Sequence, residues 1–141
     1  MKIKRIEHVS IALKSLEHTR RVLEDTLGLT MEYQEDLPEY SARLAMFPIG
    51  ETYLELVESN QAGTRTGDWI AQHGEGLYHI CLEVEDIDAA LAELKAKGVA
   101  LLDDEPRPGH GGSRIAFLDP RSTANFLVEI AEIPAGHDAT H

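Results

Sequence analysis

Two histidines and two glutamates occupy matching positions in the two halves of the chain. His8 and His79 lie 71 residues apart, and Glu55 and Glu129 lie 74 residues apart in the similar frames Tyr-Leu-Glu-Leu-Val-Glu and Leu-Val-Glu-Ile-Ala-Glu. A carboxylate between aliphatic residues is costly to bury unless a cation or a hydrogen-bond donor compensates it. We therefore predict that His8, Glu55, His79 and Glu129 bind one metal ion.

The ligand types restrict the ion. Two imidazoles and two carboxylates, completed to six-coordination by water or substrate oxygens, suit Co²⁺, Ni²⁺, Mn²⁺ or Mg²⁺, and Zn²⁺ also accepts them. A single strand histidine is more often a hydrogen-bonded core residue, and a single glutamate more often lies at a solvated edge. That alternative would have to hold at four correlated positions, so the matching spacing favours a divalent metal site.

Both histidines fall in segments with the alternation of a β-strand. In residues 6–13 and 77–84, apolar residues recur at every second position, which is typical of a strand with one apolar face. We expect the aliphatic faces to pack under helices. The opposite faces, which carry His8 or His79 with Cys81 and Glu83, suit a wet concave pocket.

The surrounding elements repeat. A helix is predicted from Ser15, as its N-cap, to Gly28, and a second helix from Asp86 to Gly98. Each helix is followed by three predicted strands: Thr30–Asp36, Ala42–Pro48 and Thr52–Glu58 in the first half, and Ala100–Asp103, Ser113–Leu118 and Phe126–Ala131 in the second. We predict one α+β domain over residues 1–141. It contains two paired βαβββ modules (about 3–58 and 76–133), a linker (59–75) and a tail (134–141).

Composition excludes several classes of partner. The chain has 141 residues and a net charge of −12, from 13 basic and 25 acidic residues. This charge opposes binding to nucleic acid and to anionic membrane surfaces. A lone cysteine rules out an intrachain disulfide and fits a reducing compartment. We expect a cytoplasmic protein with neither a nucleic-acid nor a membrane partner.

The segment from Arg107 to Ser113 is rich in glycine and has two interpretations. Its backbone N–H groups can bind an anion, and we predict substrate contacts at Arg107, Gly111, Gly112 and Ser113; a plain turn between strands is the alternative. The nearby His110, like His18 and His73, is expected to face solvent. Cys81 is interpreted as a packing residue.

Four stretches carry a resemblance to a known family. They are Ile6-Glu7-His8-Val9, Gly76-Leu77-Tyr78-His79-Ile80, Asp103-Asp104-Glu105-Pro106-Arg107-Pro108-Gly109 and Phe117-Leu118-Asp119-Pro120-Arg121-Ser122. With the paired modules, they resemble the vicinal oxygen chelate superfamily of glyoxalases, bleomycin resistance proteins and dioxygenases. The resemblance implies a cup-shaped mixed sheet with helices outside. It also implies metal ligands at His8, Glu55, His79 and Glu129.

Within that superfamily the chain is similar to the methylmalonyl-CoA epimerases. The resemblance implies a small-molecule acyl-CoA substrate, α-proton abstraction with Glu129 as base, and a metal-stabilised enolate; it is also compatible with a homodimer. One epimerase pattern has a second glutamate on a middle strand, where this chain has Leu44. Glu55 and water remain the alternatives for the second proton carrier.

Two other functions stay open. A lactoylglutathione lyase (glyoxalase I) uses the same ligand types and the same enolate chemistry, and the segment around Pro38-Glu39-Tyr40 gives it some support. A metal-free small-molecule binding or resistance protein has the same fold, but the four matching ligand positions argue against it. An extradiol dioxygenase resembles enzymes that bind their metal through two histidines and one carboxylate. The four predicted ligands of this chain therefore argue against that class too.

Overall fold

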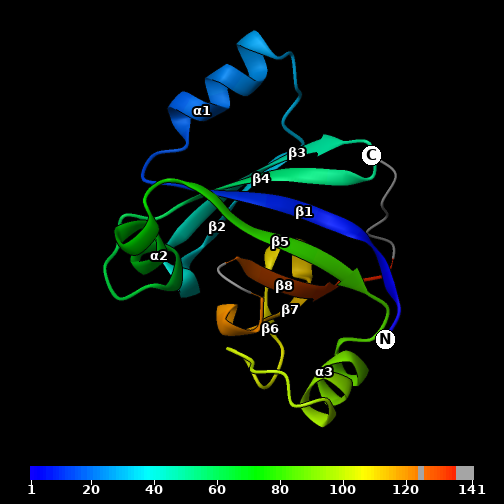
Figure 1. The fold of residues 1–141 in the computed structure, drawn as a ribbon. Coiled ribbons are helices and arrows are strands. Elements are labelled where there is room, and N and C mark those ends of the chain that lie inside the picture. Colours follow the sequence, from blue (N-terminus) through cyan, green and yellow to red (C-terminus); the bar gives the residue numbers. More distant parts are fainter. Residues whose placement is uncertain (124–125, 136–141) are drawn as a thin grey trace. The chain divides into compact units, whose positions relative to one another are not determined.

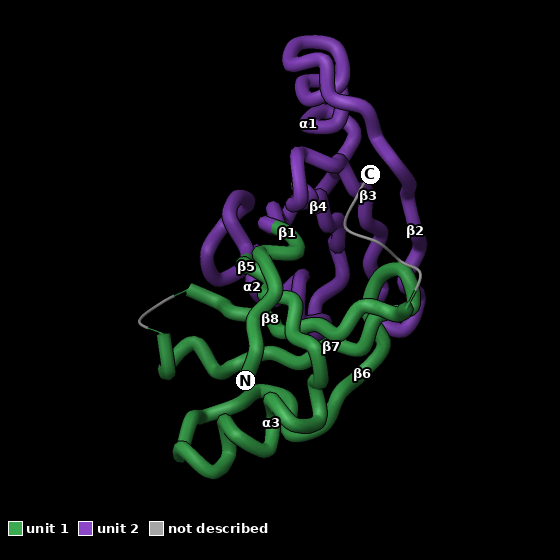
Figure 2. Tube along the Cα trace, turned by 90° about the vertical axis from the view of Figure 1, so that its right-hand side faces the viewer, with its two compact units in different colours: residues 1–8, 79–141 green, residues 9–78 purple. Residues whose placement is uncertain are grey.

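The computed structural model describes residues 1–123 and 126–135 (Figure 1). These residues form an α+β fold with parallel and antiparallel strand pairs, which confirms the predicted class. The chain divides into two compact units, unit 1 (residues 1–8 and 79–141) and unit 2 (residues 9–78) (Figure 2). Strands β1 (Ile3–Leu13) and β5 (Gly76–Val84) each continue from one unit into the other. Residues 136–141, most of the predicted tail, lie outside the described part of the chain.

Unit 2 contains three strands of one antiparallel ladder, in which β3 pairs with both β2 and β4. Its elements are α1 (Glu17–Arg21), the π-helix η1 (Val22–Thr26), β2 (Tyr33–Leu37), the 3₁₀-helix η2 (Pro38–Tyr40), β3 (Ala42–Ile49), β4 (Thr52–Glu58) and α2 (Arg65–His73). The last of these helices occupies much of the predicted linker.

The first helix begins one residue later than predicted. Ser15 is not its N-cap; Leu16 is, and its backbone N–H donates to the Glu58 carboxylate at 2.9 Å. A carboxylate distant in sequence therefore satisfies one of the donors that a helix start leaves open. Gly28 ends the helix as predicted, with a positive φ of 72°, and the N–H of Leu29 donates to the carbonyl of Leu23 at 2.9 Å.

Two apolar clusters hold unit 2 together. In one, Leu16 and Leu23 from the first helical segment pack with Phe47 and Leu56 from the ladder. In the other, Leu44 packs with the buried residues Leu37, Met46, Tyr53 and Val57. The position where some epimerases have a second glutamate is thus part of an apolar core.

Unit 1 has a mixed sheet in which β5 pairs parallel with β8, and β7 pairs antiparallel with β8 and β6. Its elements are α3 (Ile87–Ala96), β6 (Arg107–Pro108), the 3₁₀-helix η3 (His110–Gly112), β7 (Arg114–Phe117), the 3₁₀-helix η4 (Pro120–Ser122) and β8 (Leu127–Glu132). The predicted cap of α3 is confirmed, because the Asp86 side chain accepts a hydrogen bond from the N–H of Ala89 at 3.0 Å. The apolar face of α3 packs on β7 and β8 through the cluster Val84, Ile87, Ala90, Leu91, Leu94, Ala116 and Ile130.

The predicted strand at 100–103 is wrong. Among the described residues, this segment makes one isolated bridge, between Leu101 and Leu118. The N–H of Phe117 donates a hydrogen bond to the Asp103 carboxylate at 2.8 Å. A side chain thus replaces a backbone carbonyl as the acceptor. A short strand, β6, forms instead inside the predicted loop, where Arg107 pairs with Ile115. No helix among the described residues is long and apolar enough to cross a membrane.

Candidate metal centre

Strand register in unit 1 places the polar residues of β5 and β8 on one face. Cys81 lies opposite Glu129 in the parallel pair of β5 and β8, and Phe117 of β7 lies opposite Glu129 on its other side. His79 precedes Cys81 by two residues, so its side chain points to the same face. The ring of Phe117 meets the His79 ring edge-on at 5.0 Å, with an interplanar angle of 84°, which orients the imidazole.

Three ligand-type atoms converge at this face. The Nε2 atoms of His8 and His79 lie 2.9 Å apart. The Oε1 atom of Glu129 lies 3.0 Å from Nε2 of His8 and 3.2 Å from Nε2 of His79. Adjacent ligands of a six-coordinate ion, each about 2.1 Å from it, lie about 3.0 Å from one another. The three separations are therefore those of one triangular face around a small divalent cation.

The electrostatics of the cluster point the same way. Within the described part of the chain, Oε1 of Glu129 is enclosed and has no hydrogen-bond partner, although Nε2 of His8 and of His79 lie 3.0 and 3.2 Å from it. An enclosed carboxylate oxygen without a donor is costly. Burial opposes the ionisation of Glu129, but attraction to His79 and His8 outweighs it and holds the pKa of Glu129 well below its usual range. The donor set thus fits a cation, which would satisfy all three atoms.

The site residues on this face are buried, and the predicted wet pocket stays a prediction. His8, His79 and Glu129 are 1%, 7% and 4% exposed. Around the histidines, Ser10 of β1 and Cys81 of β5 are buried on the same face, whereas the neighbouring aliphatic residues Val9, Ile11, Ile80 and Leu82 are only partly buried. A site shielded from water strengthens every charge interaction inside it.

The fourth predicted ligand, Glu55, belongs to unit 2. It lies on β4 opposite Met46 of β3 and is 4% exposed. Its neighbour Leu56 is fully buried in the apolar cluster of the first helical segment. The structure thus brings His8, His79 and Glu129 together within unit 1 and places Glu55, also buried, in the other unit; its role as a ligand stays a prediction.

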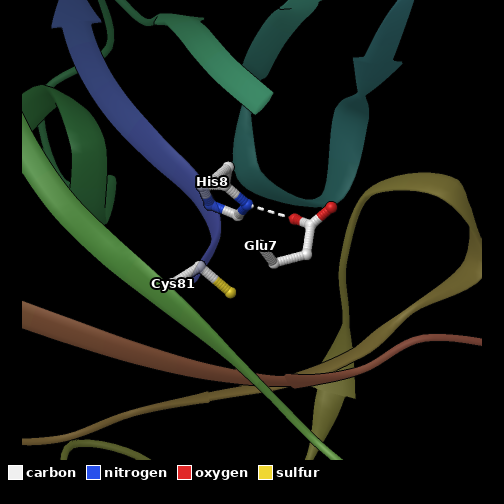
Figure 3. Close-up of side chains that lie close together, drawn as sticks. All are labelled: Glu7, His8 and Cys81. Atoms are coloured by element: carbon white, nitrogen blue, oxygen red, sulfur yellow. Dashed lines mark hydrogen bonds and ion pairs between the residues drawn. The ribbon is translucent and has the colours of Figure 1, made fainter. Parts of the chain in front are cut away.

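Two buried residues of unit 1 were not identified as site residues from the sequence. The carboxylate oxygen Oε1 of Glu7 contacts Nδ1 of His8 (Figure 3) and accepts from Nε2 of His110 at 2.8 Å. The prediction that His110 faces solvent is wrong, because it is 5% exposed, whereas His18 and His73 are exposed as predicted. Adjacent residues of a β-strand point to opposite faces, so alternation gives no reason to group Glu7 with His8. The available signal was its direct adjacency to a predicted ligand, since a histidine ligand usually donates its second N–H to a carboxylate or carbonyl.

Cys81 lies beside these residues (Figure 3). Its sulfur, a Glu7 oxygen and a His8 nitrogen lie within 4.8 Å of one another, which is a second grouping with metal-ligating atoms. Burial, reinforced by the charge of Glu129, raises the pKa of the Cys81 thiol well above its usual value. The thiol is therefore protonated at neutral pH, which favours packing over ligation by thiolate.

The predicted substrate-binding segment is compact. Nη1 of Arg107 donates to Asp103 at 3.2 Å. Gly111 and Gly112 have positive φ values of 59° and 77°, and Ser113 is 2% exposed. A Cβ atom at Gly109 would lie 2.6 Å from both Ser113 and Ile115, so only glycine fits there. The segment is thus a tight turn between β6 and β7, and its contact with substrate stays a prediction.

Comparisons with known proteins identify the family of the chain. Residues 7–117 match the family model described as the glyoxalase/bleomycin resistance protein/dioxygenase superfamily. The uncharacterized protein YqjC of Bacillus subtilis is 35% identical over 128 residues, 91% of each chain. The ethylmalonyl-CoA/methylmalonyl-CoA epimerase of Cereibacter sphaeroides is 32% identical over 133 residues, 93% of this chain and 99% of that protein. A variant of Streptomyces coelicolor methylmalonyl-CoA epimerase in complex with 2-nitronate-propionyl-CoA has a TM-score of 0.90 and 36% identity, covering 95% of this chain and 97% of that chain.

Proposed function

The chain belongs to the glyoxalase/bleomycin resistance protein/dioxygenase superfamily, and we propose that it is a metal-dependent epimerase that interconverts the two epimers of methylmalonyl-CoA. The observation that carries the proposal is the convergence of His8 Nε2, His79 Nε2 and Glu129 Oε1 within 3.2 Å of one another. Support for the reaction type comes from the similarity to acyl-CoA epimerases along nearly the whole chain.

The reaction requires an acidic hydrogen at the α-carbon of the thioester and a base close to that hydrogen. A divalent ion at this site, held by His8, His79, Glu129 and Glu55, would act as a Lewis acid toward the substrate carboxylate and the thioester oxygen. We assign Glu129 as the base: its carboxylate accepts the α-proton, and the C–H electron pair passes into the thioester carbonyl. Return of a proton to the other face inverts the carbon centre.

The environment of Glu129 fits a base of this kind. Because its pKa lies well below the usual range, Glu129 is ionised at neutral pH and ready to accept a proton. A carboxylate of low pKa is also a weak base. The proposed reaction therefore depends on the Lewis acid to make the α-hydrogen acidic. Burial of the site strengthens the charge interactions of the Glu129 carboxylate.

The second proton carrier differs from that of the epimerase pattern described above. Leu44 has no proton to give and is buried in an apolar cluster. We propose that water or Glu55 delivers the proton on the opposite face.

Proton exchange at the α-carbon tests this function. A single epimer of methylmalonyl-CoA is incubated with the ion-loaded protein in D₂O and followed by NMR, beside an assay with the hemithioacetal of methylglyoxal and glutathione. We expect deuterium at the α-carbon, conversion to the other epimer, and no reaction of the hemithioacetal. Turnover of the hemithioacetal alone would instead assign a lactoylglutathione lyase, and activity with neither substrate would refute the enzyme proposal for these compounds.

A further inference from the structure

Glu7 is a buried carboxylate for which the proposed reaction has no use. It is 1% exposed and belongs, with His8 and His110, to unit 1. Its Oε1 atom contacts Nδ1 of His8 on one side and Nε2 of His110, at 2.8 Å, on the other. One carboxylate oxygen therefore connects a predicted metal ligand to the turn between β6 and β7.

The contact with Glu7 determines which nitrogen of His8 carries the proton. An ionised carboxylate only accepts hydrogen bonds, and a neutral imidazole has one N–H and one lone pair. With Nδ1–H donating to Glu7, the lone pair of His8 resides on Nε2. That is the atom that lies 2.9 Å from His79 Nε2 and 3.0 Å from Glu129 Oε1.

The surroundings supply the Glu7 carboxylate with hydrogen-bond donors. Nε2 of His110 lies 2.8 Å from its Oε1 atom, and Nδ1 of His8 contacts the same oxygen. Its second oxygen, Oε2, lies 3.9 Å from Nη2 of Arg5. That guanidinium is committed to Glu83, to which its Nε donates at 2.6 Å. The two histidines are therefore the close partners that the structure assigns to the Glu7 carboxylate.

His110 holds the other side of the carboxylate through a rigid turn. Its ring lies edge-on to the His8 ring, with centroids 5.3 Å apart. Gly109 before it has no room for a side chain, and Ser113 after it closes the turn with an N–H to the His110 carbonyl at 3.0 Å. A backbone fixed in this way leaves the imidazole little freedom to leave Glu7.

We propose that Glu7 is a positioning residue: it holds His8 as the Nδ1–H tautomer with Nε2 directed at the metal, and His110 holds Glu7 in place. The part of this inference that concerns the ion rests on the proposed function, whereas the part that concerns the tautomer does not. Loss of such an outer partner typically lowers metal affinity 10–100-fold.

Two variants and one control test the proposal. Glu7→Gln removes the charge that favours Nδ1–H, and His110→Gln removes the second anchor. Glu83→Gln is the matched control, because it makes the same change at a buried carboxylate, 6% exposed, that forms ion pairs with Arg5 and Lys4. Long-range ¹H–¹⁵N NMR of the histidine rings reports the tautomer in the ion-free protein, and competition with a chelating dye reports Co²⁺ affinity.

In the wild type and in Glu83→Gln we expect His8 to be protonated at Nδ1 alone. In Glu7→Gln we expect a mixture of tautomers and a 10–100-fold loss of Co²⁺ affinity, and in His110→Gln a smaller loss of affinity. An unchanged His8 tautomer in Glu7→Gln, or Co²⁺ affinity within twofold of the wild type, would overturn the proposal. An equal loss in Glu83→Gln would also overturn it, since any buried carboxylate would then have the effect.

The outcomes remain separable from those of the proposed function. A wild type that binds Co²⁺ and shows the Nδ1–H tautomer, but leaves methylmalonyl-CoA unchanged, refutes the epimerase and supports the role of Glu7. If the wild type binds no Co²⁺, the tautomer measurement alone decides whether Glu7 positions His8. If Glu7→Gln does not fold, the same two measurements on His110→Gln decide.

Discussion

Replacing Glu129 by glutamine should remove the response of the protein to divalent ions. The change keeps the shape of the side chain but removes the negative charge beside His8 and His79. Taking one partner from a buried charge pair costs about 3–5 kcal/mol. At about 1.4 kcal/mol per tenfold, ion affinity should fall at least about 100-fold.

The size of the effect follows from linkage. At an ion concentration of about 100 Kd, binding stabilises the wild type by about 2.7 kcal/mol. For a chain of 141 residues this corresponds to a rise in Tm of about 10 °C, taking about 4 °C per kcal/mol. At the same concentration, a variant with 100-fold weaker binding gains about 0.4 kcal/mol, or about 2 °C.

Thermal unfolding with and without Co²⁺ measures the shift, and each variant is compared with its own ion-free form. Glu132→Gln is the control, since it makes the same change on β8 at a carboxylate that accepts from the Ile87 N–H at 3.1 Å. We expect this control to keep the full shift. A full shift in Glu129→Gln, or no shift in the wild type at saturating ion, would refute the assignment of Glu129 as a ligand.

Three further predictions concern stability. The pKa values of Glu7 and Glu129 lie below the ordinary value of 4.5 in the folded chain, so the stability that these carboxylates give to the fold is complete above that pH and is lost as the pH falls below it. Urea unfolding at pH 7, 5 and 3.5 should show this loss of stability, and Glu7→Gln should make the loss smaller. Leu91→Ala should lower the free energy of unfolding by about 2–5 kcal/mol, because Leu91 is 2% exposed in the α3 core. Leu77→Ala, at a residue 76% exposed, should change it by less than about 0.5 kcal/mol. Equal urea midpoints for the two variants would contradict this. Asp86→Ala should cost about 1 kcal/mol in the same assay through the lost cap of α3, and an unchanged midpoint would show that the cap does not contribute.

Local signals predicted most of the fold. Alternation identified β1 and β5, and the glycines that end the first helix and α3 have the positive φ that their positions imply, 72° at Gly28 and 73° at Gly98. The errors occur where a side chain distant in sequence replaces a local partner. The Glu58 carboxylate, instead of Ser15, accepts a hydrogen bond from the first helix. The Asp103 carboxylate accepts a hydrogen bond from the N–H of Phe117, where a strand was expected to pair. No local pattern carries such contacts.

The candidate site was predictable from the internal repeat and from the family resemblance. Spacing matched His8 with His79 and Glu129 with Glu55, and the structure brings the first three of that predicted set together in unit 1. Glu7 and His110 lie outside the repeat. Their contact joins residues 103 positions apart, and alternation gives no reason to group Glu7 with His8. A long side chain can reach from one face of a strand to a group on the other face, and the alternation of residue types does not reveal such a contact.

Titration of the ion-free protein with Co²⁺ tests the central claim most directly, if bound ion and α-proton exchange of methylmalonyl-CoA are recorded in the same samples. We predict that the exchange rate rises in proportion to bound ion and reaches its maximum at one ion per chain, with Glu129→Gln inactive throughout. Full exchange activity in the presence of a strong chelator, or no activity at full occupancy, would contradict the account.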